Sequence, residues 1–60
     1  MFEQYYNQLM TMKKAEIVRQ GAIWGVIAGN QTNLDYMVKN YTKIQLARFI
    51  ADRMDRFGPR

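Results

Sequence analysis

The chain has 60 residues, 48% of them hydrophobic and 13% aromatic, with a formal net charge of +4 and neither cysteine nor histidine. This composition excludes a disulfide-braced fold and the usual zinc ligands, and it holds too much apolar side chain for a disordered chain. Because a domain of this size buries only about 60% of the surface that its unfolded chain exposes, we expect a folded chain completed by oligomerisation or a partner.

The first predicted element is a helix over residues 2–29. Its first part carries a negative charge, Glu3, in the opening turn, and an apolar stripe at helical spacing formed by Phe2, Tyr5, Tyr6, Leu9 and Met10. The stripe then meets Lys13 and Lys14, so the alternative is a break near residue 11, with Thr11 as the N-cap of a second helix. Because lysines in a first turn oppose the helix dipole, we favour one long helix.

Residues 21–29 are the only uninterrupted apolar run, and glycine recurs in it at every fourth position. On a helix, Gly21, Gly25 and Gly29 would lie along a narrow strip that a second backbone can approach closely. Glycine inside a helix costs about 1 kcal/mol relative to alanine, so a compensating contact is expected. The alternative is that Gly29 caps the helix and Gly21 marks a bend. We predict an inward face of Ile17, Gln20, Gly21, Trp24, Ile27 and Ala28.

Residues 30–33 predict a turn, since Gly29 and Asn30 both tolerate the left-handed conformation that ends a helix. A short helix over residues 33–40 is expected to follow, with Thr32 and Asp35 as its capping box. Its apolar stripe comprises Leu34, Met37, Val38 and Tyr41.

The last predicted helix covers residues 43–57 and ends at Gly58-Pro59. Its start has the strongest local signal in the chain: Thr42 and Gln45 form a capping-box pair, and Tyr41 and Leu46 suit a hydrophobic staple. We predict that Leu46, Ala47, Ile50, Met54 and Phe57 face inward, and that Gln45, Arg48, Asp52, Asp55 and Arg56 face outward. No strand pattern competes, so the predicted fold is all-α, a single domain of three or four short helices in a small bundle over residues 1–60.

Several kinds of chemistry have no residues to support them. The chain lacks His, Cys and Ser, so we predict a non-enzymatic protein that uses no cofactor, metal or small-molecule substrate. Asp52 and Asp55 could share a helix face, but the arginines around them favour a salt-bridged surface, with Asp52 and Arg56 at i, i+4 spacing. We find no secretory signal and no apolar run of the ~20 residues that a membrane span needs, and we expect a cytoplasmic location.

The aromatic and methionine content points to protein–protein association. So short a chain cannot bury all of these side chains in its own core. The excess predicts a small helical regulator or adaptor that self-associates or binds and modulates a larger protein. A compact cysteine-free chain of this size is typical of small accessory proteins of bacteria and phages. The alternative within this interpretation is a homodimer core without a regulatory role. The predicted interface residues are Phe2, Tyr5, Tyr6, Leu9, Gly21, Trp24, Gly25 and Ala28.

A second interpretation is nucleic-acid binding by a helix-turn-helix variant over residues 33–57, with residues 33–40 as the first helix, residues 40–42 as the turn and the last helix as the reader. Residues 42–47, Thr-Lys-Ile-Gln-Leu-Ala, resemble the opening of the first helix in many bacterial helix-turn-helix repressors. Asp52 and Asp55 would repel phosphates. A third interpretation, a peripheral membrane binder using Trp24 and the lysines at 13 and 14, is opposed by the glycines and the Asn-rich flank. The residues predicted to contact nucleic acid are Lys39, Thr42, Lys43, Gln45, Arg48 and Arg53.

Overall fold

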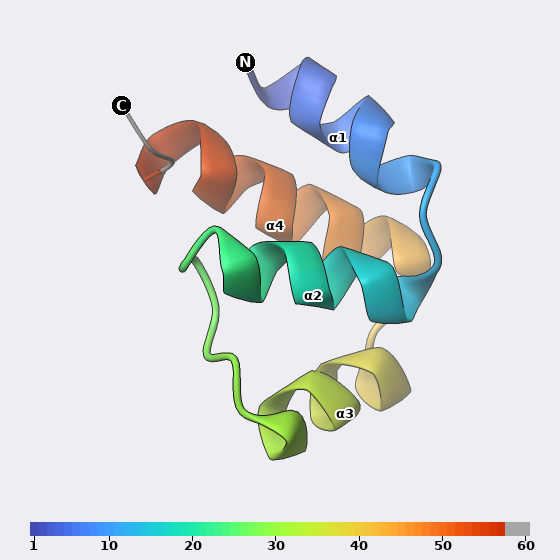
Figure 1. Ribbon diagram of the computed structural model, residues 1–60. Helices are drawn as coiled ribbons and strands as arrows, with labels where there is room; N and C mark the ends of the chain where they lie inside the picture. The colour runs from blue at the N-terminus through green and yellow to red at the C-terminus, as the bar shows by residue number, and fades with distance from the viewer. Residues whose placement is uncertain (58–60) are drawn as a thin grey trace.

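A computed structural model describes residues 1–57 and contains, within them, four helices (Figure 1). These are α1 (Phe2–Met10), α2 (Lys14–Ile23), α3 (Gln31–Asn40) and α4 (Lys43–Phe57). The described residues form no strand, so the all-α prediction is confirmed. The predicted helix end at Gly58-Pro59 lies outside the described residues.

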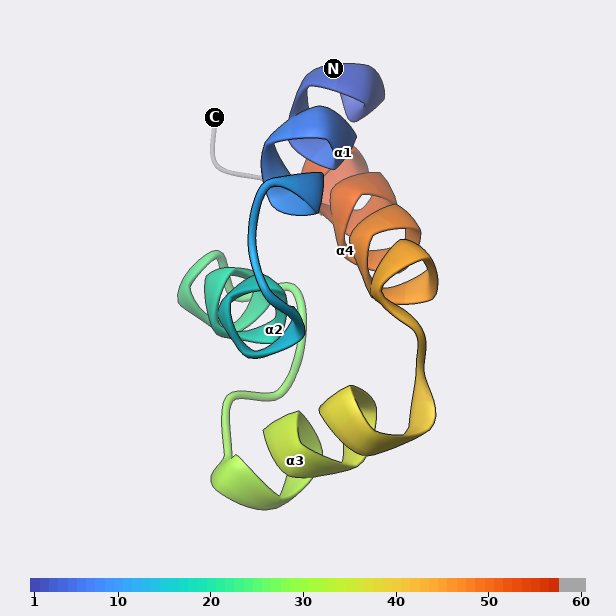
Figure 2. The same ribbon diagram turned by 90° about the vertical axis from the view of Figure 1, so that its right-hand side faces the viewer.

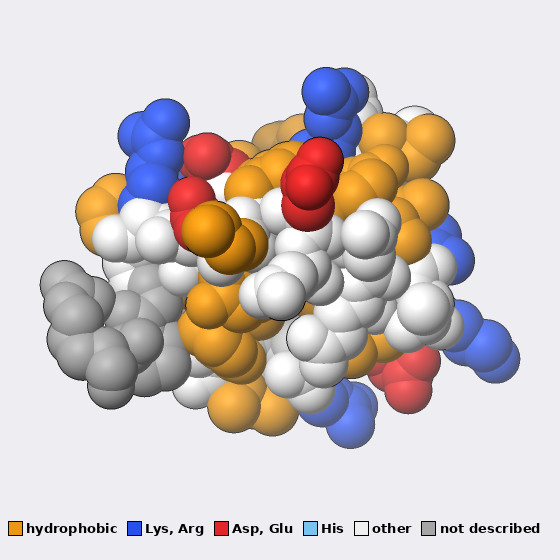
Figure 3. Space-filling model, turned by 90° about the horizontal axis from the view of Figure 1, so that it is seen from above, with side chains coloured by type: hydrophobic (Ala, Val, Ile, Leu, Met, Phe, Trp, Pro, Cys, Tyr) orange, Lys and Arg blue, Asp and Glu red, His pale blue; other side chains and the backbone are white. Residues whose placement is uncertain are grey.

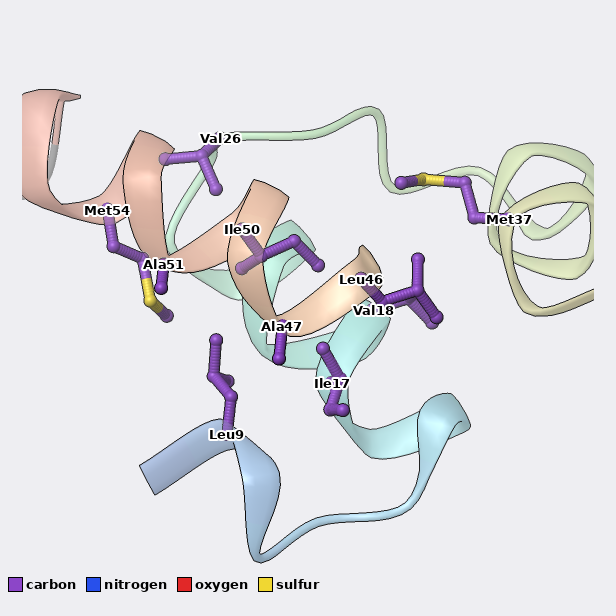
Figure 4. Close-up of a cluster of buried hydrophobic side chains, with 10 residues drawn as sticks. All are labelled: Leu9, Ile17, Val18, Val26, Met37, Leu46, Ala47, Ile50, Ala51 and Met54. Carbon is purple, nitrogen blue, oxygen red and sulfur yellow. The ribbon is translucent and has the colours of Figure 1, made fainter. Parts of the chain in front are cut away.

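Helix α4 is the centre of the arrangement, because α1 and α2 both pack against it. α1 and α4 lie side by side and run in opposite directions, which brings the N-terminal amine of Met1 within 3.4 Å of the Asp55 carboxylate (Figures 1 and 2). α3 packs on α2, at the opposite end of the molecule from α1 (Figure 2). Half of the buried core comes from α4 (Figure 4), and the ten core residues are Leu9, Ile17, Val18, Val26, Met37, Leu46, Ala47, Ile50, Ala51 and Met54.

The inward face of α4 is largely as predicted. Leu46, Ala47, Ile50 and Met54 are buried, whereas Phe57 is 60% exposed and was wrongly placed in the core. Phe57 is the last residue of the helix, and its ring lies under the Arg53 guanidinium with 5.5 Å between Cζ and the ring centroid. One face of the Phe57 ring is therefore in contact with the guanidinium of an arginine.

The inward faces of the other helices match less closely. On α2, Ile17 and Gly21 are buried as predicted, and Val18 is buried although it was not predicted. On α3, Met37 is buried, whereas Tyr41, the C-cap residue, is exposed. The remaining residues of the two predicted stripes are half-buried, apart from the exposed Ala28; they are Gln20, Trp24, Ile27, Leu34 and Val38.

The favoured single helix over residues 2–29 is wrong, because the chain breaks between Met10 and Lys14. Thr11 is not the N-cap of the second helix but the C-cap of the first, and its hydroxyl donates to the Gln8 carbonyl oxygen at 2.7 Å. The N-cap of α2 is Lys13, whose backbone N–H donates to the Glu16 carboxylate at 3.2 Å. A carboxylate in this first turn opposes the charge of the two lysines and favours a helix start.

The helical glycine strip is also wrong, because α2 ends at Ile23 and Gly25 lies beyond it with φ of +77°. The Val26 N–H donates to the Gly21 carbonyl and the Gly25 N–H to the Ala22 carbonyl, both at 3.0 Å. This pair of bonds is a Schellman motif with Gly25 at the C′ position, where a left-handed residue is required. Gly29 is in the following loop, so the three glycines do not share a helical face.

Replacing Gly25 by alanine should lower the free energy of unfolding by about 1–2 kcal/mol, because a Cβ is disfavoured at positive φ. Urea denaturation followed by circular dichroism measures the change. Gly29→Ala is the matched control: no positive φ occurs there, and the new Cβ would lie 3.4 Å from the Ala22 Cβ, an ordinary contact. Equal losses in the two variants would contradict the Schellman assignment.

The two later helix starts differ in how well they were predicted. The capping box of Thr42 and Gln45 is confirmed, with Thr42 N–H donating to Gln45 Oε1 at 2.9 Å and Gln45 N–H to Thr42 Oγ1 at 3.1 Å. The predicted box of Thr32 and Asp35 is wrong, since α3 begins two residues earlier than expected, at Gln31. Its N-cap is Asn30, whose side-chain oxygen accepts from the Asn33 N–H at 2.8 Å.

Candidate functional site

A groove of about 520 Å³ lies between α3, α4 and the loop that follows α2. Its position follows from the packing, because α3 rests on α2 while α4 packs against α1 and α2. Val26 of the loop lies beside α4, and Met37 extends from α3 at the other end of this region (Figure 4). The groove is lined by Val26, Ile27, Ala28, Asn33, Tyr36, Met37, Tyr41, Gln45, Leu46, Phe49 and Arg53.

Three exposed aromatic side chains stand around the groove. Tyr36 is 57%, Tyr41 40% and Phe49 46% exposed. The two tyrosine rings meet edge to face, with centroids 6.3 Å apart and an interplanar angle of 80°. Met37 and Leu46, which belong to the buried core, also line the groove. The groove therefore combines exposed aromatic side chains with part of the surface of the core. Aromatic side chains and methionine are enriched in the centres of protein interfaces.

Arg53 is the only charged residue among the described residues that line the groove. Its Nε donates to the Val26 carbonyl oxygen at 2.7 Å, a contact that spans 27 positions of the chain. Its Cζ lies 5.2 Å from the Phe49 ring centroid and 5.5 Å from that of Phe57. The guanidinium is therefore held in one place by a loop carbonyl and two aromatic rings.

The described residues 1–57 contain neither a cluster of metal ligands nor a membrane-spanning helix. No three Asp or Glu side chains in that range lie close enough to hold a metal ion together. Likewise, none of the helices described is both long and apolar enough to cross a membrane. The described side chains that line the groove offer apolar contact, tyrosine hydroxyls, two side-chain amides and one guanidinium.

The structure does not bring the predicted protein-interface residues together on one surface. Leu9 and Gly21 are buried inside the chain itself. The ring of Phe2 stacks on that of Tyr6 with centroids 5.8 Å apart, and Tyr5 meets Trp24 edge to face at 5.3 Å. These four aromatic residues are partly buried and pack against the core. The other two predicted residues are Gly25, an exposed turn residue, and Ala28, which lies in the groove.

Sequence reasoning missed the aromatic residues of the groove. Tyr41 was assigned to a core stripe, and neither Tyr36 nor Phe49 was given a role. A usable signal was present on the last helix, where Phe49, Arg53 and Phe57 recur at every fourth position and so share a face. Arg53 itself was predicted only as a contact to nucleic acid.

The residues predicted to contact nucleic acid are spread around α3 and α4. Arg48 follows Lys43 by five positions, which is about 140° around a helix, and the same angle separates Arg48 from Arg53. Arg53 is half-buried and bonded to the Val26 carbonyl. Lys39, Thr42 and Gln45 are exposed, but Gln45 is engaged in the capping box. The three predicted basic residues Lys43, Arg48 and Arg53 therefore do not share one face of α4.

Elsewhere on the described surface, charged groups form two ion pairs, one of which joins the Met1 amine to Asp55. The predicted pair of Arg56 with Asp52 is confirmed at 3.3 Å. On the face seen in Figure 3, hydrophobic side chains form several separate areas, and Lys and Arg side chains project mainly at the edge of the outline. In comparisons with protein-family models, curated proteins and solved structures, nothing matched this chain.

Proposed function

We propose that this chain is a non-enzymatic helical adaptor or regulator that acts by protein–protein association through the groove between α3 and α4. The observation that carries the proposal is the exposed aromatic group of Tyr36, Tyr41 and Phe49 around a hollow of about 520 Å³. Covering such surface is favourable by about 25 cal/mol per Å² of apolar area removed from water. Aromatic and arginine side chains in a concave site are also the residue types that dominate binding energy at interfaces.

A protein partner fits this groove better than a nucleic acid does. Affinity for nucleic acid comes largely from several cations that contact phosphates at once. Only Arg53 supplies such a charge among the described lining residues, and it is held between rings and a carbonyl. The apolar and aromatic lining is instead suited to side chains of another polypeptide.

Photo-crosslinking from inside and outside the groove tests the proposal. A benzophenone amino acid replaces either Phe49 or Ile44, which are on the same helix and are 46% and 50% exposed, respectively. Ile44 does not line the groove. We expect position 49, but not position 44, to form a discrete protein adduct in cells that produce the chain. Phe49→Ser should then weaken binding of the purified adduct partner by at least about tenfold.

The outcomes separate the possible functions. Equal adducts from both positions, or none from position 49, would contradict association through the groove. An adduct between two copies of the chain would support association but identify it as self-association. Binding to random duplex DNA that weakens steeply with salt, and that Phe49→Ser leaves unchanged, would overturn the proposal in favour of the nucleic-acid alternative.

A further inference from the structure

From the charge and shape of the groove we infer what occupies it: an acidic amphipathic helix of another protein, with apolar side chains in the groove and a carboxylate on Arg53. This inference rests on the proposed function and specifies its partner. Helices that bind in grooves present apolar anchors at i, i+4 and i+7 along one face. The neighbouring positions of such a helix are free to carry the acidic residue.

The volume of the groove suits a helix face with a few anchors. A cavity of about 150 Å³ lined by apolar side chains holds one benzene-sized group. A groove of about 520 Å³ can therefore take about three side chains of that size, which is the number on two turns of an amphipathic helix. Tyr36 and Phe49, both exposed at the groove, are placed to contact the sides of such anchors.

Arg53 is positioned to receive a carboxylate. The structure gives its guanidinium one hydrogen bond, from Nε to the Val26 carbonyl, so the terminal N–H groups have no partner among residues 1–57. These groups can donate to a carboxylate in parallel. Because the rings of Phe49 and Phe57 already hold the guanidinium, little side-chain freedom is lost on binding. No Asp or Glu is among the described lining residues to compete for it.

Charge argues against a second copy of this chain as the occupant. Each copy carries a net charge of +4, so two copies repel each other at long range. Two of the five acidic residues are also in ion pairs within the chain, Asp52 with Arg56 at 3.3 Å and Asp55 with the N-terminal amine at 3.4 Å. A partner segment with an excess of Asp and Glu gains both the pairing with Arg53 and the long-range attraction.

A pair of designed peptides tests the inference directly. Both are amphipathic helices with leucine at i, i+4 and i+7; one carries glutamate beside the leucine stripe and the other carries lysine at the same positions. Fluorescence anisotropy with the full chain at low salt gives the two affinities. We expect the glutamate peptide to bind at least about tenfold more tightly than the lysine peptide. We expect Phe49→Ser to abolish binding of both.

Variants of the arginines assign the preference to one residue. Arg53→Gln should remove the preference for glutamate, and Arg53→Lys should restore part of it. Arg48→Gln removes an exposed charge about 140° away on α4 and should leave the preference intact. Circular dichroism verifies that each variant is folded, because Arg53 also bonds the Val26 carbonyl.

The inference and the proposed function fail in different ways. Equal affinity for the two peptides, or an equal loss of preference in Arg48→Gln and Arg53→Gln, would overturn the acidic helix, whatever the crosslinking shows. If neither peptide binds while position 49 still crosslinks a partner, the inference is wrong and the proposed function stands. A crosslink to a second copy would likewise overturn the inference alone.

Discussion

Replacing Ile50 by alanine should lower the free energy of unfolding by about 2–5 kcal/mol. Ile50 has 0% exposure at the middle of α4, the helix against which α1 and α2 both pack. Truncation removes its transfer free energy and leaves a cavity among several helices. At about 0.05–0.15 kcal/mol per residue, a chain of 60 residues has a total stability of only about 3–9 kcal/mol. The variant should therefore be partly or wholly unfolded at 37 °C.

The adjacent residue provides the control for Ile50→Ala. Phe49 is 46% exposed, so Phe49→Ala should reduce stability by less than about 1 kcal/mol, although it removes a larger side chain. Thermal and urea unfolding followed by circular dichroism compare the two variants under the same conditions. A larger loss of stability for Phe49→Ala than for Ile50→Ala would mean that Phe49, and not Ile50, faces the core. It would also contradict the exposed position of Phe49 at the groove.

Replacing Gly21 by leucine should destabilise the chain by about 1–3 kcal/mol or more, through overpacking. A Cβ at Gly21 would already lie 3.1 Å from Ile50 Cδ1 and 3.2 Å from Ile27 Cδ1, so even one added carbon is tight. The larger side chain has to displace α4 or the residues after α2. Gly21→Ala should change stability much less, because its gain in helix propensity of about 1 kcal/mol offsets the tight contact.

A double-mutant cycle shows whether this contact lies within one chain. In an Ile50→Val background, which lacks Cδ1 but should stay folded, Gly21→Ala should be more favourable than in the wild type, because the shortened side chain leaves room for the new methyl. Urea unfolding at two widely different protein concentrations measures the coupling. A coupling that appears only at high concentration would place the Gly21 contact between chains, as an intermolecular glycine strip requires, and would contradict the packing of α2 on α4.

Local signals were sufficient for the features that depend on neighbours in the chain. The bounds of α4, its buried stripe through Leu46 and Ile50, and the capping box at its start could all be predicted. A helix face and a cap need only residues three or four positions apart. The break near Thr11 was only the alternative prediction, because the lysines oppose a helix start there. The contact of the Glu16 carboxylate with the Lys13 N–H, which favours that start, was not part of the prediction.

The candidate site could not be predicted in the same way. Phe49 and Arg53 belong to one helix, and their spacing is readable, but Tyr36 and Val26 reach them only after α3 has packed on α2. The predicted interface residues show a second effect of tertiary packing. Tyr5 and Trp24 were predicted to contact a partner protein, but their rings pack against each other within the chain, with centroids 5.3 Å apart.

The sequence by itself determined an all-α chain and the amphipathic last helix, since periodicity and capping are local properties. Only the tertiary structure decided that Gly25 ends a helix, that the close contact at Gly21 is with α4, and which aromatic residues stay exposed. Burial depends on the packing of segments far apart in the chain, and a short loop that redirects a helix changes every later contact. The groove and its single arginine are consequences of that packing.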